Sequence, residues 1–160
     1  MRLHVMRHGP AEDRAPSGRD FDRALTPTGR DLVRRMGEVL RAAVSEPPRI
    51  FASPRRRAQE TARLVAEAFR LSDAAITLRD ELDGEERIPV ELAEELAIVG
   101  PEVLLVGHQP VVEDLVRSLV EEPRPRLLGF RTAMIVTLER GAGPTDWALS
   151  TIHDPDRLPP

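Results

Sequence analysis

The stretch Leu3-His4-Val5-Met6-Arg7-His8-Gly9-Pro10 decides the fold of this chain, because it leads from a short apolar segment directly into two basic side chains. Residues 3–6 predict a buried strand, and the pair Gly9-Pro10 ends any regular structure. Arg7 and His8 are therefore expected at the carboxyl end of the first strand. In open α/β sheets, ligands bind at that end of the strands.

A second segment further along the chain repeats this arrangement. Residues 103–106 form a continuous apolar run, and Gly107-His108-Gln109-Pro110 follows at once. His8 and His108 thus each lie at the exit of a buried strand and beside a glycine. This repetition indicates that the two histidines share one site.

The rest of the chain alternates between helical and extended patterns. Thr26 and Pro27 predict the start of a helix, as its N-cap and first helical residue, and Ser53-Pro54 is expected to cap the next helix. The alternation predicts an α/β fold: a three-layer α/β/α sandwich with a mostly parallel central sheet and an antiparallel C-terminal edge hairpin. The other predicted elements are a polar loop over residues 10–23, strands over 49–52 and 75–78, an acidic loop over 80–87, helices over 90–99 and 111–120, and a closing hairpin of residues 133–138 and 147–152.

Length and composition narrow the class of protein. The 160 residues fit one domain, so we expect residues 1–160 to form a single domain. The formal net charge of -4 argues against nucleic acid as a partner, and the absence of cysteine excludes disulfides, thiol catalysis and zinc–thiolate sites. No apolar run is long enough to span a bilayer, and the amino terminus lacks a secretory pattern. We therefore expect a cytoplasmic monomer without a membrane partner.

The helix predicted after Ser53 would complete a site at the strand exits. Its first turn offers unpaired backbone N–H groups, and arginines at positions 55–57 add planar donors that suit phosphate oxygens. With Arg7 alongside, such a pocket fits a tetrahedral dianion. A neutral imidazole in line with phosphorus is a competent nucleophile that would form a covalent phosphohistidine, while the arginines neutralise charge on the transferring group. We expect no cofactor and no metal, because an arginine beside a histidine ligand would repel a cation.

Four motifs, in their order and spacing, resemble the histidine phosphatase superfamily, also called the phosphoglycerate mutase-like family. The resemblance runs from residue 1 to about residue 121 and implies a phosphoglycerate mutase-like fold. The chain is short where larger members carry a substrate lid, which is similar to the small SixA-type phosphohistidine phosphatases. The motifs are Arg7-His8-Gly9, Leu25-Thr26-Pro27-Thr28-Gly29, Ser53-Pro54-Arg55-Arg56-Arg57-Ala58-Gln59-Glu60-Thr61-Ala62 and Val106-Gly107-His108-Gln109-Pro110.

The resemblance implies roles for individual residues. His8 is the phosphate-accepting nucleophile, and His108 is the second histidine, which contacts the phosphoryl group. Arg7 and Arg57 are the phosphate ligands. Arg57 is preferred over its neighbours because it directly precedes Ala58, as in the family pattern.

Other basic residues are expected outside this cluster. Arg55 and Arg56 are interpreted as a solvated face or as a basic rim near the site. His4 alternates with apolar neighbours on the first strand and is expected to be packed, whereas His153 is expected at the surface.

A general acid is sought among the acidic residues after the third predicted strand, because family phosphomonoesterases place a glutamate there. We choose Glu81 as the general acid. The alternative is that the acidic loop is solvated and contains no catalytic residue. An alkoxide leaving group needs a proton, whereas an imidazole leaves readily from phosphohistidine, so a missing acid would disable ester hydrolysis more than N–P cleavage. The candidates are Asp80, Glu81, Asp83, Glu85 and Glu86.

The leading hypothesis for function is a metal-independent phosphatase that removes phosphate from phosphohistidine on a signalling or phosphotransfer protein. The alternative is a small-molecule phosphomonoesterase of the same superfamily, acting on a phosphorylated metabolite. A non-enzymatic phospho-ligand-binding protein is disfavoured, because a pure binder does not need the nucleophile. Mutase activity is least favoured, because a mutase must retain its phosphoryl donor in a closed pocket.

Overall fold

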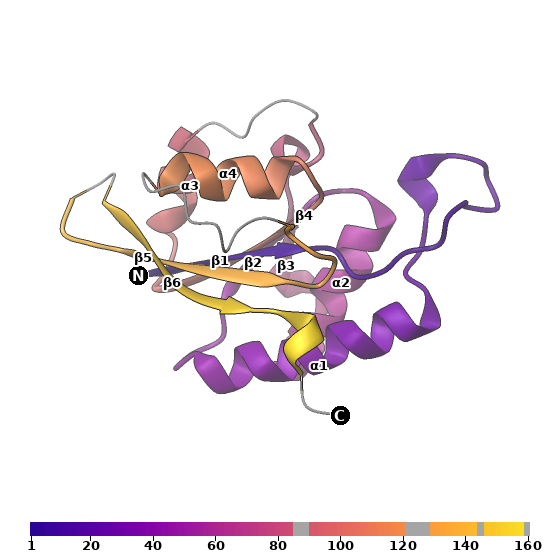
Figure 1. Cartoon of the computed structure of the whole chain (residues 1–160), viewed down its shortest axis with the longest axis horizontal. Helices are drawn as coiled ribbons and strands as arrows, with labels where there is room; N and C mark the ends of the chain where they lie inside the picture. Colours follow the sequence, from indigo (N-terminus) through magenta and orange to yellow (C-terminus); the bar gives the residue numbers. More distant parts are fainter. Residues whose placement is uncertain (85–89, 121–128, 144–145, 159–160) are drawn as a thin grey trace.

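In the computed structural model of the chain, one mixed sheet lies between two layers of helices (Figure 1). The structure describes residues 1–84, 90–120, 129–143 and 146–158. Helices α1 (Pro27–Ala43) and α2 (Arg56–Ala68) cover one face of the sheet, and α3 (Val90–Ala97) and α4 (Val111–Leu119) cover the other. None of the helices in these ranges combines the length and apolar character that a membrane crossing requires.

The sheet has six strands in the order β3-β2-β4-β1-β5-β6. The first four in this order run parallel, β5 runs antiparallel to β1, and β6 runs antiparallel to β5. The predicted three-layer sandwich with an antiparallel C-terminal edge hairpin is therefore confirmed. The strands are β1 (Arg2–Arg7), β2 (Arg49–Ala52), β3 (Ile76–Leu78), β4 (Glu102–Gly107), β5 (Ile135–Arg140) and β6 (Trp147–His153).

The helix starts agree with the sequence in one case and differ in another. Thr26 is the N-cap of α1, and its Oγ1 accepts a hydrogen bond from the Gly29 N–H at 3.0 Å, as predicted. The prediction that Ser53 caps α2 is wrong, because the N-cap residue is Arg55 and its side chain makes no capping bond. The Ser53 hydroxyl instead accepts the Arg55 N–H at 3.3 Å, in the turn before the helix. The segments expected as loops hold the 3-10 turns η1 (Asp20–Asp22) and η3 (Asp80–Leu82).

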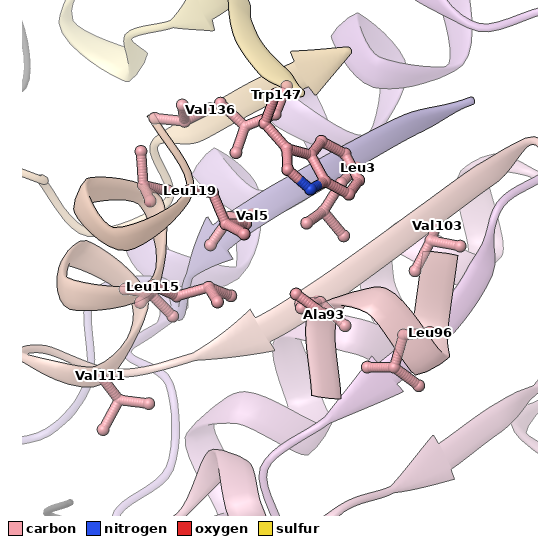
Figure 2. Close-up of a cluster of buried hydrophobic side chains, with 14 of the residues drawn as sticks. Leu3, Val5, Ala93, Leu96, Val103, Val111, Leu115, Leu119, Val136 and Trp147 are labelled. Carbon is pink, nitrogen blue, oxygen red and sulfur yellow. The ribbon is translucent and has the colours of Figure 1, made fainter. Parts of the chain in front are cut away.

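Alternation of side chains along the central strands divides the core into two clusters. Leu3 and Val5 of β1 pack in the cluster under α3 and α4, together with Leu115 of α4 (Figure 2). Met6 belongs to the cluster under α1 and α2. Because both faces of β1 are buried, a slip of one residue would exchange the two sets, so the register is strongly specified. That register sets where β1 ends relative to its neighbouring strands.

A buried polar network joins the central strands. His4 Nε2 lies 2.8 Å from Glu102 Oε2 on β4, and His4 Nδ1 lies 2.9 Å from Thr137 Oγ1 on β5. Glu102 is only 4% exposed and also accepts from the Arg2 guanidinium. His4 is therefore packed, as predicted. His153, predicted at the surface, is half-buried at the end of β6.

Replacement of Glu102 by alanine should destabilise the protein by about 3–5 kcal/mol, because it leaves His4 and Arg2 without their common partner in a buried setting. The measurement is the free energy of unfolding in urea. Glu139→Ala is the matched control, since that glutamate lies exposed on β5, and its loss should stay within about 0.5 kcal/mol. Equal losses for the two variants would contradict a structural role for the network.

Candidate active site

The carboxyl ends of β1, β4 and β2 meet at one edge of the sheet. Arg7 pairs with Gly107 in the parallel register, and the His8 N–H donates to the Gly107 carbonyl oxygen at 2.9 Å. On the other side of β4, the Ser53 N–H donates to the Val106 carbonyl oxygen at 2.9 Å. The three motifs therefore leave the sheet side by side, as the sequence predicted.

Two glycines allow the segment after β1 to pack against the start of α1. A Cβ atom on Gly9 would lie 2.4 Å from Val33 Cγ2 in the buried face of α1. A Cβ atom on Gly29 would lie 2.1 Å from the carbonyl oxygen of Pro10, which is backbone and cannot move aside easily. The glycines of the first two motifs thus serve one close approach.

Thr61 ties this segment to α2. Its Oγ1 accepts the Gly9 N–H at 3.0 Å and donates to the Arg57 carbonyl oxygen at 2.7 Å. Thr61 is fully buried, so both bonds are protected from water. The backbone beside His8 is thereby held against the first turn of α2, which carries Arg57.

The imidazole of His8 has a defined tautomer. Nδ1 lies 2.7 Å from the Gly9 carbonyl oxygen, which only accepts, so Nδ1 carries the proton and Nε2 carries a lone pair. Arg57 Nε donates to that Nε2 at 3.3 Å. Burial of the 7% exposed ring, with a further contribution from the charges of Arg57 and Arg7, lowers the pKa of His8 to about 4. His8 is therefore neutral at pH 7, with its lone pair on the nitrogen that faces Arg57.

Asp20, in the turn η1, binds the Nη1 and Nη2 atoms of Arg57. Arg57 Nη1 donates to the backbone oxygen of Asp20 at 2.9 Å, and Nη2 donates to Asp20 Oδ2 at 3.0 Å. Hydrogen bonds from Arg23 and from Arg57 lower the pKa of Asp20, whereas desolvation raises it. The net result is a pKa of about 2. Asp20 is thus a carboxylate at neutral pH.

Arg7 and His108 complete the cluster. Arg7 Nη1 donates to the Phe130 carbonyl oxygen at 2.9 Å, which orients the guanidinium group. Arg7 Nε and His108 Nδ1 are buried and have no hydrogen-bond partner among the residues that the structure describes. Burial, then the positive charges of Arg55 and Arg57, lower the pKa of His108. Buried polar atoms without partners are costly, so these two indicate contact with a ligand that brings hydrogen-bonding oxygens.

The neighbours of Arg57 differ from each other. Arg55 is 20% exposed and forms ion pairs with Asp20, at 2.6 Å, and with Asp83. Arg56 is 53% exposed and pairs with Glu60 at 2.8 Å. Arg55 therefore forms part of the rim of the site, whereas Arg56 lies on the solvated face.

Glu81, the expected general acid, has no contact with the cluster among the interactions of the described residues. Glu81 is exposed, and its partner is Arg79, whose hydrogen bonds at 2.9 and 3.2 Å lower the pKa of Glu81. Among the other candidates, Asp83 contacts Arg55 and lies 3.5 Å from the Ser53 hydroxyl. Glu85 and Glu86 lie outside the described residues.

Two residues of the site were missed from the sequence. Asp20 lies in the polar loop before α1, where nothing in the local pattern separates it from its charged neighbours. Thr61 stands within a quoted motif, but its spacing from Arg57 became informative only once α2 placed both on one helical face. In the described part of the chain, no cluster of three or more His, Asp or Glu side chains could hold a metal ion.

Alanine substitution should rank the three arginines. Arg57→Ala should lower kcat/KM by at least about tenfold, because a hydrogen bond to a charged group contributes about 1.5–3 kcal/mol. Arg55→Ala should cost less, through the loss of an Asp20 partner, and Arg56→Ala should cost least. Hydrolysis of an aryl phosphate by the three purified variants provides the measurement. Equal losses would show that the cluster acts only through its total charge.

Comparison with known proteins identifies the family of this chain. The family model "Histidine phosphatase superfamily (branch 1)" matches residues 3–85. The phosphohistidine phosphatase SixA of Escherichia coli (strain K12) is 31% identical over 153 residues, which cover 94% of both chains.

Solved structures show the same fold. The protein histidine phosphatase SixA complexed with tungstate matches with a TM-score of 0.83 and 26% identity, over 99% of this chain and 100% of the other. A mycobacterial glucosyl-3-phosphoglycerate phosphatase complexed with VO3 matches with a TM-score of 0.71 and 20% identity, over 94% of this chain and 97% of the other. On these grounds the chain belongs to the histidine phosphatase superfamily, branch 1, a family of hydrolases with the phosphoglycerate mutase-like fold.

Proposed function

We propose that this protein removes the phosphoryl group from phosphohistidine on a partner protein, through a covalent phosphohistidine on His8 and without a metal ion. The observation that carries the proposal is the state of His8, whose neutral ring presents the Nε2 lone pair beside the Arg57 guanidinium group. A lone pair on a buried nitrogen among positive charges suits attack on a phosphorus atom whose oxygens those charges hold.

The proposed reaction has two displacements. In the first, His8 Nε2 attacks phosphorus, a new N–P bond forms, and the N–P bond of the substrate breaks to release its imidazole. In the second, water attacks the phosphorus on His8, the Nε2–P bond breaks and returns its electron pair to the ring, and inorganic phosphate leaves while one proton of the water passes to solvent. Arg7, Arg57 and His108 would hold the phosphoryl oxygens in both steps, and the bond from His8 Nδ1–H to the Gly9 carbonyl oxygen would stabilise the ring as it gains charge.

Phosphohistidine is preferred over a phosphate ester because of the leaving group. Glu81 is paired with Arg79 and ionised at neutral pH, so it is poorly placed to supply a proton. An alkoxide requires that proton, whereas an imidazole does not. The similarity over nearly the whole chain to a phosphohistidine phosphatase supports the same substrate class, and tungstate in the similar solved structure is a tetrahedral oxyanion, as phosphate is.

The direct test is hydrolysis of a phosphotransfer domain phosphorylated on histidine, with EDTA present. We expect release of phosphate, inhibition by vanadate, which mimics five-coordinate phosphorus, and an acid-labile, base-stable phosphoenzyme on quenching. His8→Ala should give neither turnover nor label.

Label that persists in His8→Ala would refute the nucleophile. Activity that disappears with EDTA and returns with magnesium or zinc would refute metal independence. Rapid turnover of sugar phosphates with no turnover of the phosphoprotein would favour the small-molecule alternative.

A leaving-group series tests Glu81 separately. If Glu81 protonates the leaving group, Glu81→Gln should lower kcat/KM for alkyl phosphates by about 10²-fold and leave aryl phosphates and phosphohistidine almost unchanged. The ion pair with Arg79 leads us to expect the other result, in which the plots of log kcat/KM against leaving-group pKa for wild type and variant run parallel. Lines that diverge at high leaving-group pKa would establish Glu81 as the acid.

A further inference from the structure

Asp20 contacts three arginines at the edge of the site, and the proposed reaction does not use these contacts. Its Oδ2 accepts from Arg57 Nη2 at 3.0 Å and from Arg55 Nη1 at 2.6 Å, while its Oδ1 accepts from Arg23 Nη1 at 2.8 Å. Its backbone oxygen accepts a hydrogen bond from Arg57 Nη1 at 2.9 Å. One residue on a surface turn thus binds three guanidinium groups.

The contacts on Arg57 divide the guanidinium group into two edges. The outer edge, formed by Nη1 and Nη2, is held by the backbone oxygen and the carboxylate of Asp20. The inner edge carries Nε, which lies 3.3 Å from His8 Nε2. A planar guanidinium group held at two points on one edge keeps little freedom to rotate, so the direction of the other edge is set.

We propose that Asp20 is a positioning residue, which grips the outer edge of Arg57 and thereby aims its inner edge at the phosphoryl group during transfer from substrate to His8. This inference rests on the proposed function, because it concerns the same anion site. Phosphoryl oxygens would replace His8 Nε2 as the acceptor from Arg57 Nε, which would release the His8 lone pair for attack and leave the Asp20 carboxylate in place.

Asp20 also separates like charges. Arg55 and Arg57 carry positive charges and bind the same carboxylate oxygen. Without the carboxylate, mutual repulsion would turn the two guanidinium groups apart, and Arg57 is the one next to the nucleophile.

The same contacts permit an opposite role, in which Asp20 occupies the place of a phosphoryl oxygen and competes with substrate. The two roles predict changes of opposite sign. A positioning residue strengthens binding of anions that resemble the transition state, whereas a competing carboxylate weakens binding of every anion at the site.

The experiment compares Asp20→Asn and Asp20→Ala with wild type. For an aryl phosphate, we expect kcat to fall about 10- to 100-fold in Asp20→Ala, with KM changed less than about threefold, and a smaller loss of kcat in Asp20→Asn, which keeps an acceptor oxygen. The dissociation constant for vanadate, measured by calorimetry, should rise in parallel with the loss of kcat. The dissociation constant for inorganic phosphate should rise much less.

Asp22→Asn is the matched control. It removes the same charge from the same turn, but Asp22 accepts hydrogen bonds from Ser17 and Arg19, which lie outside the cluster. Its kcat and vanadate affinity should stay within about twofold of wild type. A second control is the double variant Arg57→Ala with Asp20→Ala, whose kcat should equal that of Arg57→Ala, because Asp20 acts through Arg57.

Three results would overturn the proposal. Tighter vanadate and phosphate binding in Asp20→Ala would identify a competing carboxylate. Full additivity in the double variant would show that Asp20 does not act through Arg57, and an equal effect of Asp22→Asn would reduce it to a general charge effect. Failure of the proposed function looks different, because it would leave wild type without vanadate binding or without label on His8.

Discussion

A buried imidazole that stays neutral among guanidinium groups is the constraint on which the rest of this site depends. Burial and the nearby charges of Arg57 and Arg7 act in the same direction on the pKa of His8, and the bond to the Gly9 carbonyl oxygen opposes them only in part. The protein thereby keeps a nucleophilic lone pair at neutral pH by the same charges that would hold the phosphoryl oxygens. Moving the ring into water would weaken both effects together.

This arrangement needs the His8 ring and the guanidinium groups at fixed relative positions, and the sheet sets these positions. β1 and β4 have both faces buried, so their register cannot slip without exchanging the side chains of the two core clusters. The network of His4 and Glu102 adds a polar link between the same strands. Thr61 then transfers the position of the β1 exit to the first turn of α2, which sets Arg57 relative to His8.

The sequence predicted those parts of the site that follow directly from strand ends. An apolar run followed directly by a glycine and a basic residue places that residue at a strand exit of an α/β sheet, so the sequence alone predicts that Arg7, His8 and His108 lie together. Asp20 could not be predicted as part of the site, because the path of the polar loop over α2 places it there. No periodic pattern in the sequence specifies that path. The misplaced cap at Ser53 has a related cause: a turn between strand and helix used its hydroxyl before the helix began.

Charge balance joins Asp20 to the choice of ligand. Asp20 and Asp83 offset part of the positive charge of Arg55, Arg57 and Arg23, while Arg7 keeps no carboxylate partner among the contacts described. The cluster therefore retains net positive charge without leaving every guanidinium group free to turn. A phosphoryl group near pH 7 carries close to two negative charges, which matches a site that is positive but already partly organised. The carboxylates that bind the arginines thus reduce the reorganisation that phosphoryl binding would otherwise require. Electrostatic catalysis depends on such preorganised charges.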